Sequence, residues 1–267
     1  MFVVGCQRSG TTLMGQILGA HPSALLADEK DRLYASMEAI FNASDDRTRN
    51  DLIAVLCARA MGKYRSTERR SQSDVRSLVL QAPNLTWSHV EIARCLPGAR
   101  VVYMQRDPRA VVASMQRLSN VPFVDNQIRF FRKTGFIPRD FPEEWEMLIS
   151  DGTDEAVKMA LVAKIKMSLV DRFERAGLPA HIVKYEDLVS EPATTVRRTL
   201  EALSLPFDEA CLTHDRLLQG YGPGNTDRMR PIDAASVSAW RECLTTETEE
   251  AIWAAVGSFC TSLGYER

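Results

Sequence analysis

The segment Gly5–Thr12 has the residue types and spacing of an anion-binding loop. Its two glycines are separated by four residues, and it lies between an apolar run and a segment with helical apolar periodicity. A strand, a glycine-bounded loop and a helix in this order direct backbone N–H groups and a helix N-terminus at phosphate oxygens. The glycine spacing matches that of a Walker A loop. Thr11 stands where that motif has lysine, however, and the positive charge comes from Arg8 inside the loop.

A second candidate anion site begins at Arg106, directly after another apolar run. Pro108 fits the first position of a helix and Asp107 its N-cap, so Ser114 lies about two turns along that helix. The guanidinium of Arg106 and the hydroxyl of Ser114 can then clamp a phosphate between them. The alternative is a capped helix with a surface ion pair.

The elements that must position these residues alternate along the chain. The expected strands are Phe2–Gly5, Leu25–Asp28, Leu78–Gln81, Arg100–Gln105 and His181–Tyr185. The expected helices span roughly residues 10–20, 31–63, 87–96, 108–119, 143–176, 192–204 and 246–263. This alternation predicts one α/β domain over residues 1–267, with a central parallel sheet flanked by helices. The irregular segment 119–142 is either a surface excursion packed on its own phenylalanines or a lid or acceptor-binding loop.

The composition is that of an ordinary globular protein. In 267 residues, 33 Lys and Arg face 35 Asp and Glu, so no basic excess points to a nucleic acid or to an anionic membrane surface. No apolar run approaches the roughly 18 residues of a membrane-spanning helix, and the first residues lack a signal-peptide pattern. We therefore expect a soluble cytoplasmic protein. The 6 cysteines are scattered without a CxxC or a Cys/His cluster, which argues against a disulfide framework or a structural metal.

The segment Gly5–Met14 resembles the 5′-phosphosulfate loop of sulfotransferases that use PAPS, 3′-phosphoadenosine 5′-phosphosulfate. The similarity is greatest to the tyrosylprotein-sulfotransferase branch and its bacterial relatives. Ala20–Pro22 and the acidic pair Asp28–Glu29 stand where that branch has its AHP turn and its own acidic pair. The resemblance extends from Phe2 to Tyr265 and implies a P-loop-like sulfotransferase fold.

The resemblance implies PAPS as the sulfuryl donor and no metal. It assigns the 5′-phosphosulfate to Arg8, Ser9, Gly10, Thr11 and Thr12. Arg106 and Ser114 are similar in type and spacing to the family's 3′-phosphate element. Tyr185, in a stretch similar to the family's YEDL sequence, is expected to contact the nucleoside. Arg230 occupies the place of a lysine that reaches the nucleotide phosphates in the family.

Glu29 is the expected general base, because the corresponding glutamate has that role in the tyrosylprotein branch. Asp28 is the alternative base, and a plain capping role for both carboxylates is a third interpretation. Arg8 is expected to act on the leaving group. The sequence departs from the family at Gln81, which replaces a cation that contacts the bridging region of PAPS, and at Arg32, which is one position late. Arg8 then carries the leaving-group role alone, the enzyme is slow, or the acceptor site is arranged differently.

The expected reaction is sulfuryl transfer from PAPS to a hydroxyl, and the expected acceptor is a tyrosine in a peptide or protein. An acidic peptide would need a basic surface, for which the candidates are Arg129, Arg132, Lys133 and Arg139. The alternative acceptor is a small-molecule or carbohydrate hydroxyl. Two further hypotheses are a nucleotide kinase or NTPase with a degenerate loop and a nucleotide-binding module without catalysis. The sequence leaves the oligomeric state open.

Overall fold

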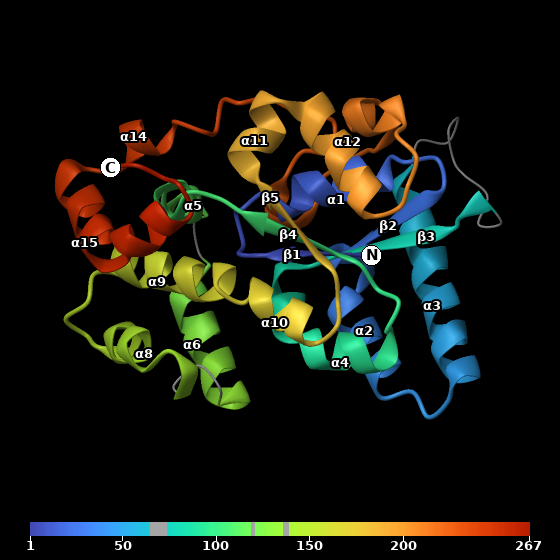
Figure 1. Cartoon of the computed structure of the whole chain (residues 1–267), viewed down its shortest axis with the longest axis horizontal. Helices are drawn as coiled ribbons and strands as arrows, with labels where there is room; N and C mark the ends of the chain where they lie inside the picture. The colour runs from blue at the N-terminus through green and yellow to red at the C-terminus, as the bar shows by residue number, and fades with distance from the viewer. Residues whose placement is uncertain (65–73, 119–120, 136–138) are drawn as a thin grey trace. The chain divides into compact units, whose positions relative to one another are not determined.

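Five parallel strands form one sheet in the computed structural model, which describes residues 1–64, 74–118, 121–135 and 139–267 (Figure 1). The order across the sheet is β2 (Ala24–Asp28), β3 (Ser77–Gln81), β1 (Phe2–Gly5), β4 (Val101–Gln105) and β5 (Ala180–Lys184). In the central pair, Phe2 lies opposite Val101 and Gly5 opposite Met104. The parallel α/β fold predicted from the sequence is confirmed, and each strand lies within one residue of its expected range.

The described residues fall into two compact units. Unit 1 comprises Met1–Gly5, Gly10–Gln105 and Val170–Asp233, and unit 2 comprises Cys6–Ser9, Arg106–Leu169 and Ala234–Arg267. Unit 1 carries the whole sheet, and unit 2 carries the first half of the glycine-bounded loop. That residues 1–267 act as one sulfotransferase domain stays a prediction.

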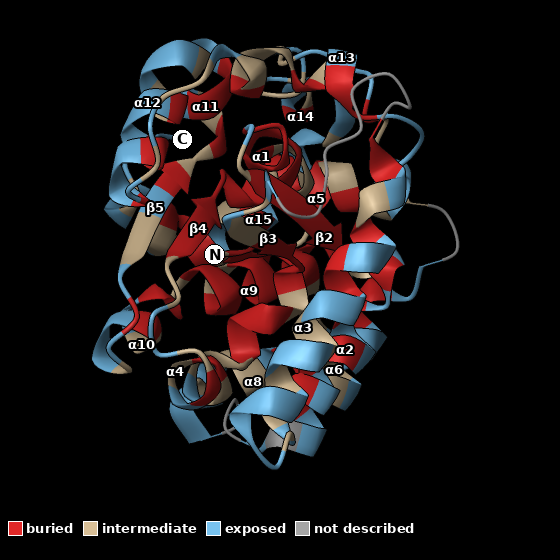
Figure 2. Ribbon diagram, turned by 90° about the vertical axis from the view of Figure 1, so that its right-hand side faces the viewer, coloured by how far each residue is buried: buried red, intermediate tan, exposed pale blue. Residues whose placement is uncertain are grey.

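In unit 1, helices cover both faces of the sheet (Figure 1). They are α1 (Thr11–Gly19), α2 (Leu33–Phe41), α3 (Asp46–Ala60), α4 (His89–Cys95), α10 (Val170–Arg175), α11 (Tyr185–Ser190), α12 (Pro192–Ala202) and α13 (His214–Leu217). Short 3-10 turns are η1 (Glu29–Asp31), η2 (Met61–Lys63), η5 (Pro83–Trp87), η6 (Glu209–Thr213) and η7 (Pro223–Asn225). Figure 2 shows β4 and most of α1 as buried. All residues of β1 and β4 are buried, which agrees with the continuous apolar runs expected of strands covered on both faces.

In unit 2, α9 (Glu155–Met167) is the central helix. It packs against α5 (Pro108–Gln116), α6 (Phe123–Thr134), α8 (Pro142–Ile149) and α15 (Thr246–Ser262), and α14 (Trp240–Cys243) packs on α5. Most of α9 from Ala156 onward is buried, as expected for a helix that is apolar on nearly all sides.

Three expected elements differ from the structure. The helix expected over 31–63 is divided into α2 and α3 because Asp45 caps a new helix, accepting a hydrogen bond from Thr48 N at 2.8 Å. The helix expected over 143–176 is likewise divided into α8, α9 and α10. Segment 119–142 contains the 12-residue helix α6, because its helix breakers Pro122 and Gly135 lie at the two ends of that helix. Residues 119–120 and 136–138 of this segment, which the sequence interprets as a surface excursion or as a lid or acceptor-binding loop, lie outside the described residues.

Candidate functional site

The two anion-binding segments predicted from the sequence follow neighbouring strands. β1 and β4 are paired in parallel, so the chain leaves both at the same edge of the sheet. From β1 it continues to β2 on one side of this pair, and after β4 the next strand is β5 on the other side. Such a switch point in an open parallel sheet is where ligands bind.

Within unit 2, the structure brings together Arg8, Arg106 and Ser114. Arg8 Nε donates to Ser114 Oγ at 3.0 Å, and Arg106 Nη1 donates to the Arg8 carbonyl oxygen at 2.8 Å. Arg106 Nη2 donates to the carbonyl oxygen of Ser236 at 2.6 Å. The hydroxyl oxygen of Ser114 therefore accepts a hydrogen bond from Arg8, whereas the sequence predicts that Ser114 acts together with Arg106. Two guanidinium groups and one hydroxyl converge on four residues of loop, which suits an anion with several oxygens.

The loop between β1 and α1 makes a sharp turn at Cys6–Ser9. Ser9 Oγ donates to the Cys6 carbonyl oxygen at 2.6 Å, and Arg8 has a left-handed backbone with φ of 64°. Arginine rarely adopts this conformation, and strain of this kind concentrates at ligand-binding turns. Burial raises the pKa of the Cys6 thiol to about 12, so this cysteine is protonated and a poor nucleophile at neutral pH.

Asp107 and Arg109 form the structural base of the second segment. Asp107 caps α5 by accepting from Arg109 N at 2.9 Å, and its carboxylate pairs with the Arg109 guanidinium. The Arg109 side chain is buried, stacks 4.1 Å from the ring centroid of Trp240 and also pairs with Glu249. The predicted capped helix is present. Its ion pair, between Asp107 and Arg109, is buried, whereas the interpretation as a plain capped helix places an ion pair on the surface.

Within unit 1, Tyr185 lies against the second glycine of the loop. Gly10 has φ of 93°, and a Cβ atom there would lie 2.5 Å from Cδ2 of Tyr185. Tyr185 is the first residue of α11, directly after β5, and is 8% exposed. A Cβ atom at Gly222 would lie 3.1 Å from Cγ2 of Thr12, so the late loop also contacts the start of α1.

Gln81 occupies the end of β3 beside the same helix start. Its Nε2 lies 3.4 Å from Thr11 Oγ1, and the side chain is buried. The amide can donate a hydrogen bond but adds no positive charge, as the sequence indicates.

Asp28 is buried in a network of charges. Its Oδ2 lies 3.0 Å from Lys63 Nζ and 2.6 Å from Arg228 Nη2, and Lys63 also pairs with Asp31. Burial alone would raise the pKa of Asp28, but Lys63 and Arg228 outweigh it, so the pKa lies below its usual range. A carboxylate that is paired in this way with two cations is a poor proton acceptor.

Glu29 is the first residue of η1, at the end of β2, where the sequence places it. Its carboxylate is hydrogen-bonded to the hydroxyl of Tyr34, which also interacts with the backbone of Asn84. Desolvation of the phenol oxygen, together with the nearby Glu29 charge, raises the pKa of Tyr34, so the phenol is a neutral donor, although the residue as a whole is 38% exposed. The Glu29 carboxylate therefore already accepts a hydrogen bond from a tyrosine hydroxyl.

Arg230 lies in the loop between Gln219 and Asp233, as expected, but its guanidinium forms an ion pair with Asp233. Its Nε lies 2.6 Å from Asp233 Oδ2, and the side chain is 53% exposed. The buried arginine of this loop is Arg228, which pairs with Asp28 and to which the sequence assigned no role. Arg230 as a phosphate contact stays a prediction.

The buried charges around Asp28 predict a pH-dependent stability. Asp28→Asn should lower the free energy of unfolding by about 3 kcal/mol at pH 7, because it leaves Arg228 without its carboxylate. The Asp28 carboxylate has a lowered pKa in the folded chain, so it stabilises the fold above the unfolded value of 3.8. That contribution is lost as the pH falls through the lowered folded pKa. The difference between the two proteins, measured by urea unfolding, should be largest at pH 7 and should shrink below pH about 4.

Asp46→Asn is the matched control, because Asp46 is exposed and pairs with Arg49 on the surface. It should cost no more than about 0.5 kcal/mol at any pH. Equal losses in the two variants, or a loss at Asp28 that does not change with pH, would contradict a buried ionic role.

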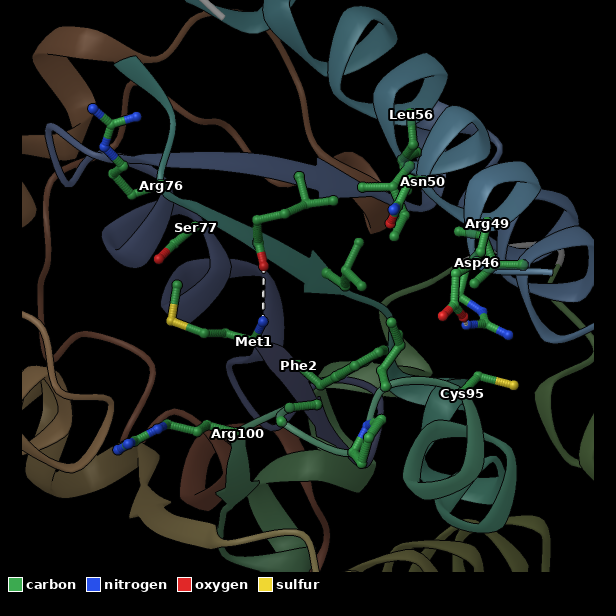
Figure 3. A pocket seen from close by; sticks show the side chains of 18 of the residues that line it. Met1, Phe2, Asp46, Arg49, Asn50, Leu56, Arg76, Ser77, Cys95 and Arg100 are labelled. Carbon is green, nitrogen blue, oxygen red and sulfur yellow. Dashed lines mark hydrogen bonds and ion pairs between the residues drawn. The ribbon is translucent and has the colours of Figure 1, made fainter. Parts of the chain in front are cut away.

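A pocket of about 600 Å³ lies at the amino ends of the strands (Figure 3). Met1, Ser77 and Arg100 line it, and the Met1 amino group donates to the Leu78 carbonyl oxygen at 2.8 Å. It is thus at the opposite edge of the sheet from Glu29. No residue of the predicted site lines it, so we assign no step of a reaction to it.

The described residues contain neither a grouped set of metal-ligating side chains nor a helix able to span a membrane. No three or more His, Cys, Asp or Glu side chains in the described ranges are grouped to hold a metal ion. In the same part of the chain, every helix is too short or too polar to span a bilayer.

Comparison with known proteins yields a family match. A model described as "Sulfotransferase family" matches residues 1–209. Among curated proteins, the nodulation protein NoeE of Sinorhizobium fredii is 26% identical over 289 residues, covering all of this chain and 66% of NoeE. Protein-tyrosine sulfotransferase 1 of Danio rerio is 24% identical over 281 residues, covering all of this chain and 72% of that protein. The chain thus spans about two thirds of the length of these relatives.

Among solved structures, the sulfotransferase domain from the curacin biosynthetic pathway has a TM-score of 0.55 and 16% sequence identity. The alignment covers 99% of this chain and 97% of that domain. At this identity the likeness concerns the fold.

Proposed function

The chain belongs to the sulfotransferase family, and on this premise we propose that it transfers the sulfuryl group of PAPS to an acceptor hydroxyl. The observation that carries the proposal is the convergence of Arg8, Arg106 and Ser114 on the glycine-bounded loop. It supplies cations and hydrogen-bond donors where the chain leaves the two central strands.

The described residues fit a bisphosphorylated nucleotide. In unit 2, Arg8 and Ser9 would hold the 5′-phosphosulfate, and Arg106 with Ser114 the 3′-phosphate. In unit 1, Gly10, Thr11 and Thr12 begin α1 with their N–H groups at its positive end, and Tyr185 would contact the nucleoside. A Cβ at Gly10 would meet the Tyr185 ring, so the absence of a side chain there lets Tyr185 pack directly against the loop.

The chemistry that PAPS supplies is a sulfuryl group attached to a good leaving group. The chain's own residues must align the acceptor hydroxyl, remove its proton and stabilise the negative charge that develops on the leaving phosphate. Glu29 would accept the hydroxyl proton as general base. Arg8 would stabilise the leaving group, with its guanidinium orientation fixed by Ser114 Oγ.

For the acceptor we propose a tyrosine of a peptide or protein. The Glu29 carboxylate accepts a hydrogen bond from the Tyr34 phenol, which is the contact that a base must make with a tyrosine acceptor. The basic residues of α6 (Arg129, Arg132 and Lys133) are a candidate surface for an acidic peptide. The Danio rerio relative is a protein-tyrosine sulfotransferase, which supports the same acceptor.

The acceptor assignment is tested by sulfuryl transfer from labelled PAPS to paired peptides. An acidic peptide with one tyrosine should be labelled, and the same peptide with phenylalanine should not. A simple phenol and a sugar are included as competing acceptors. Transfer to the sugar with none to the peptide would replace the tyrosine assignment by a carbohydrate one.

The donor assignment predicts a selective effect of Arg106→Ala. Loss of a charge-assisted contact to the 3′-phosphate should weaken binding of 3′,5′-ADP by about 10- to 100-fold in a calorimetric titration. Binding of 5′-AMP, which has no 3′-phosphate, should weaken much less, although Arg106 also supports the loop through the Arg8 carbonyl oxygen. Equal losses for both nucleotides would contradict the 3′-phosphate assignment.

A further inference from the structure

Lys166 is a buried cation that no sequence motif singles out. It lies in the last turn of α9 and is 0% exposed. Lysine is almost never fully buried unless its ammonium is held by polar partners, because desolvation of the charge is costly. The complete burial of Lys166 therefore indicates that its ammonium has polar partners inside the protein.

The ammonium of Lys166 is directed at the candidate donor loop. Its Nζ donates to Oε1 of Gln7 at 2.8 Å, and Gln7 is the residue before Arg8. Arg106 binds the next residue of the same loop through the Arg8 carbonyl oxygen. Three cationic side chains of unit 2 therefore surround the loop residues Cys6–Ser9 or belong to them: Arg8, Arg106 and Lys166.

Another lysine of the same helix points to nearly the opposite side of α9, because residues two apart in an α-helix are rotated by about 200°. Lys164, two residues earlier, pairs with the carboxylate of Glu144 at 2.6 Å and is 24% exposed. Lys166 instead donates to an amide of the loop. The two lysines have the same chemistry but different partners, so one of them is a natural control for the other.

We propose that Lys166 is a positioning residue of the donor loop, which orients Gln7 and adds a third positive charge to this cluster of unit 2. The inference rests on the proposed function. In a buried site the effective dielectric is low, so a cation one side chain removed from a phosphate still stabilises the bound anion. Lys166 makes and breaks no bond in the reaction, and its effect is on the affinity for the 5′-phosphosulfate end of the donor.

The test compares two nucleotides in the full chain and in Lys166→Met, which keeps the length of the side chain and removes its charge. Affinity for 3′,5′-ADP should fall about tenfold, whereas affinity for adenosine 3′-phosphate, which lacks the 5′-phosphate, should stay within about twofold. In steady-state assays the KM for PAPS should rise while the KM for the acceptor is unchanged. Lys164→Met should leave both affinities unchanged.

A structural role would give a different pattern. If Lys166 only supports the fold, Lys166→Met should lower the affinity for both nucleotides equally, together with the midpoint of thermal unfolding, and the proposal is overturned. Unchanged affinity for 3′,5′-ADP overturns it too. Should Lys166→Met fail to fold, Gln7→Ala removes the acceptor of the same hydrogen bond and must reproduce the selective loss for 3′,5′-ADP. If the unsubstituted protein binds no 3′,5′-ADP, the proposed function fails, and this inference with it.

Discussion

Glu29→Gln is expected to lower kcat by about 10²- to 10⁴-fold, the usual contribution of a positioned general base. Glutamine keeps the size of the side chain and can still hydrogen-bond to Tyr34, but it cannot take a proton from an acceptor hydroxyl. Affinity for 3′,5′-ADP should not change, because the donor contacts lie on other residues. The measurement is initial-rate kinetics with labelled PAPS beside calorimetric titration of the same preparation.

Glu38→Gln provides a control of identical chemistry on the exposed surface of α2, and it should leave the rate unchanged. A Glu29→Gln protein with full activity would show that the proton leaves by another route. Asp28 would then be the group to examine, although its contacts with Lys63 and Arg228 hold it as a buried counter-ion.

Arg8→Met is expected to lower kcat/KM by about 10³-fold, within the range seen when an electrostatic group on a transferring or leaving group is removed. The effect should be large because Gln81, at the position of the family's lysine, carries no charge. Arg8 Nε is oriented by Ser114 Oγ, so Ser114→Ala should reproduce part of the loss through misorientation. The measurement is the rate of sulfuryl transfer at subsaturating PAPS.

Arg129→Met is the control for loss of a positive charge, since Arg129 lies on α6 and its guanidinium bonds to Asn126 of the same helix. With a peptide-free phenol as acceptor it should have the parent rate. An Arg8→Met protein within about threefold of the parent would mean that the leaving group is stabilised elsewhere, which removes the central electrostatic part of the mechanism.

The strands were predictable from the sequence because parallel strands covered on both faces are short continuous apolar runs, as in Phe2–Gly5 and Val101–Gln105. Helix boundaries were less predictable. Asp45 starts a new helix within a pattern that looks continuous, and Gly135 ends α6 where the sequence suggests an irregular segment. Caps act locally, but whether a given Asp or Gly is used as one depends on the packing of its neighbours.

The grouping of Arg8, Arg106 and Ser114 was predictable because the two segments follow neighbouring parallel strands, whereas their role in binding an anion stays a prediction. Arg228 and Lys166 were not predictable, because their roles depend on contacts across long stretches of sequence. Arg228 reaches Asp28, and Lys166 reaches Gln7. A buried lysine or arginine has no local signature, since its neighbours in the sequence are those of an ordinary helix or loop. The network around Asp28 was therefore visible only in the folded chain.

The measurement that tests the central claim most directly is calorimetric titration of the unsubstituted protein with 3′,5′-ADP and with ATP, each with and without Mg²⁺. A PAPS-dependent sulfotransferase should bind the bisphosphate with a Kd on the order of micromolar, independently of the metal, and bind ATP weakly. Preference for ATP in the presence of Mg²⁺, with weak binding of 3′,5′-ADP, would contradict the account and would favour a nucleotide kinase or NTPase.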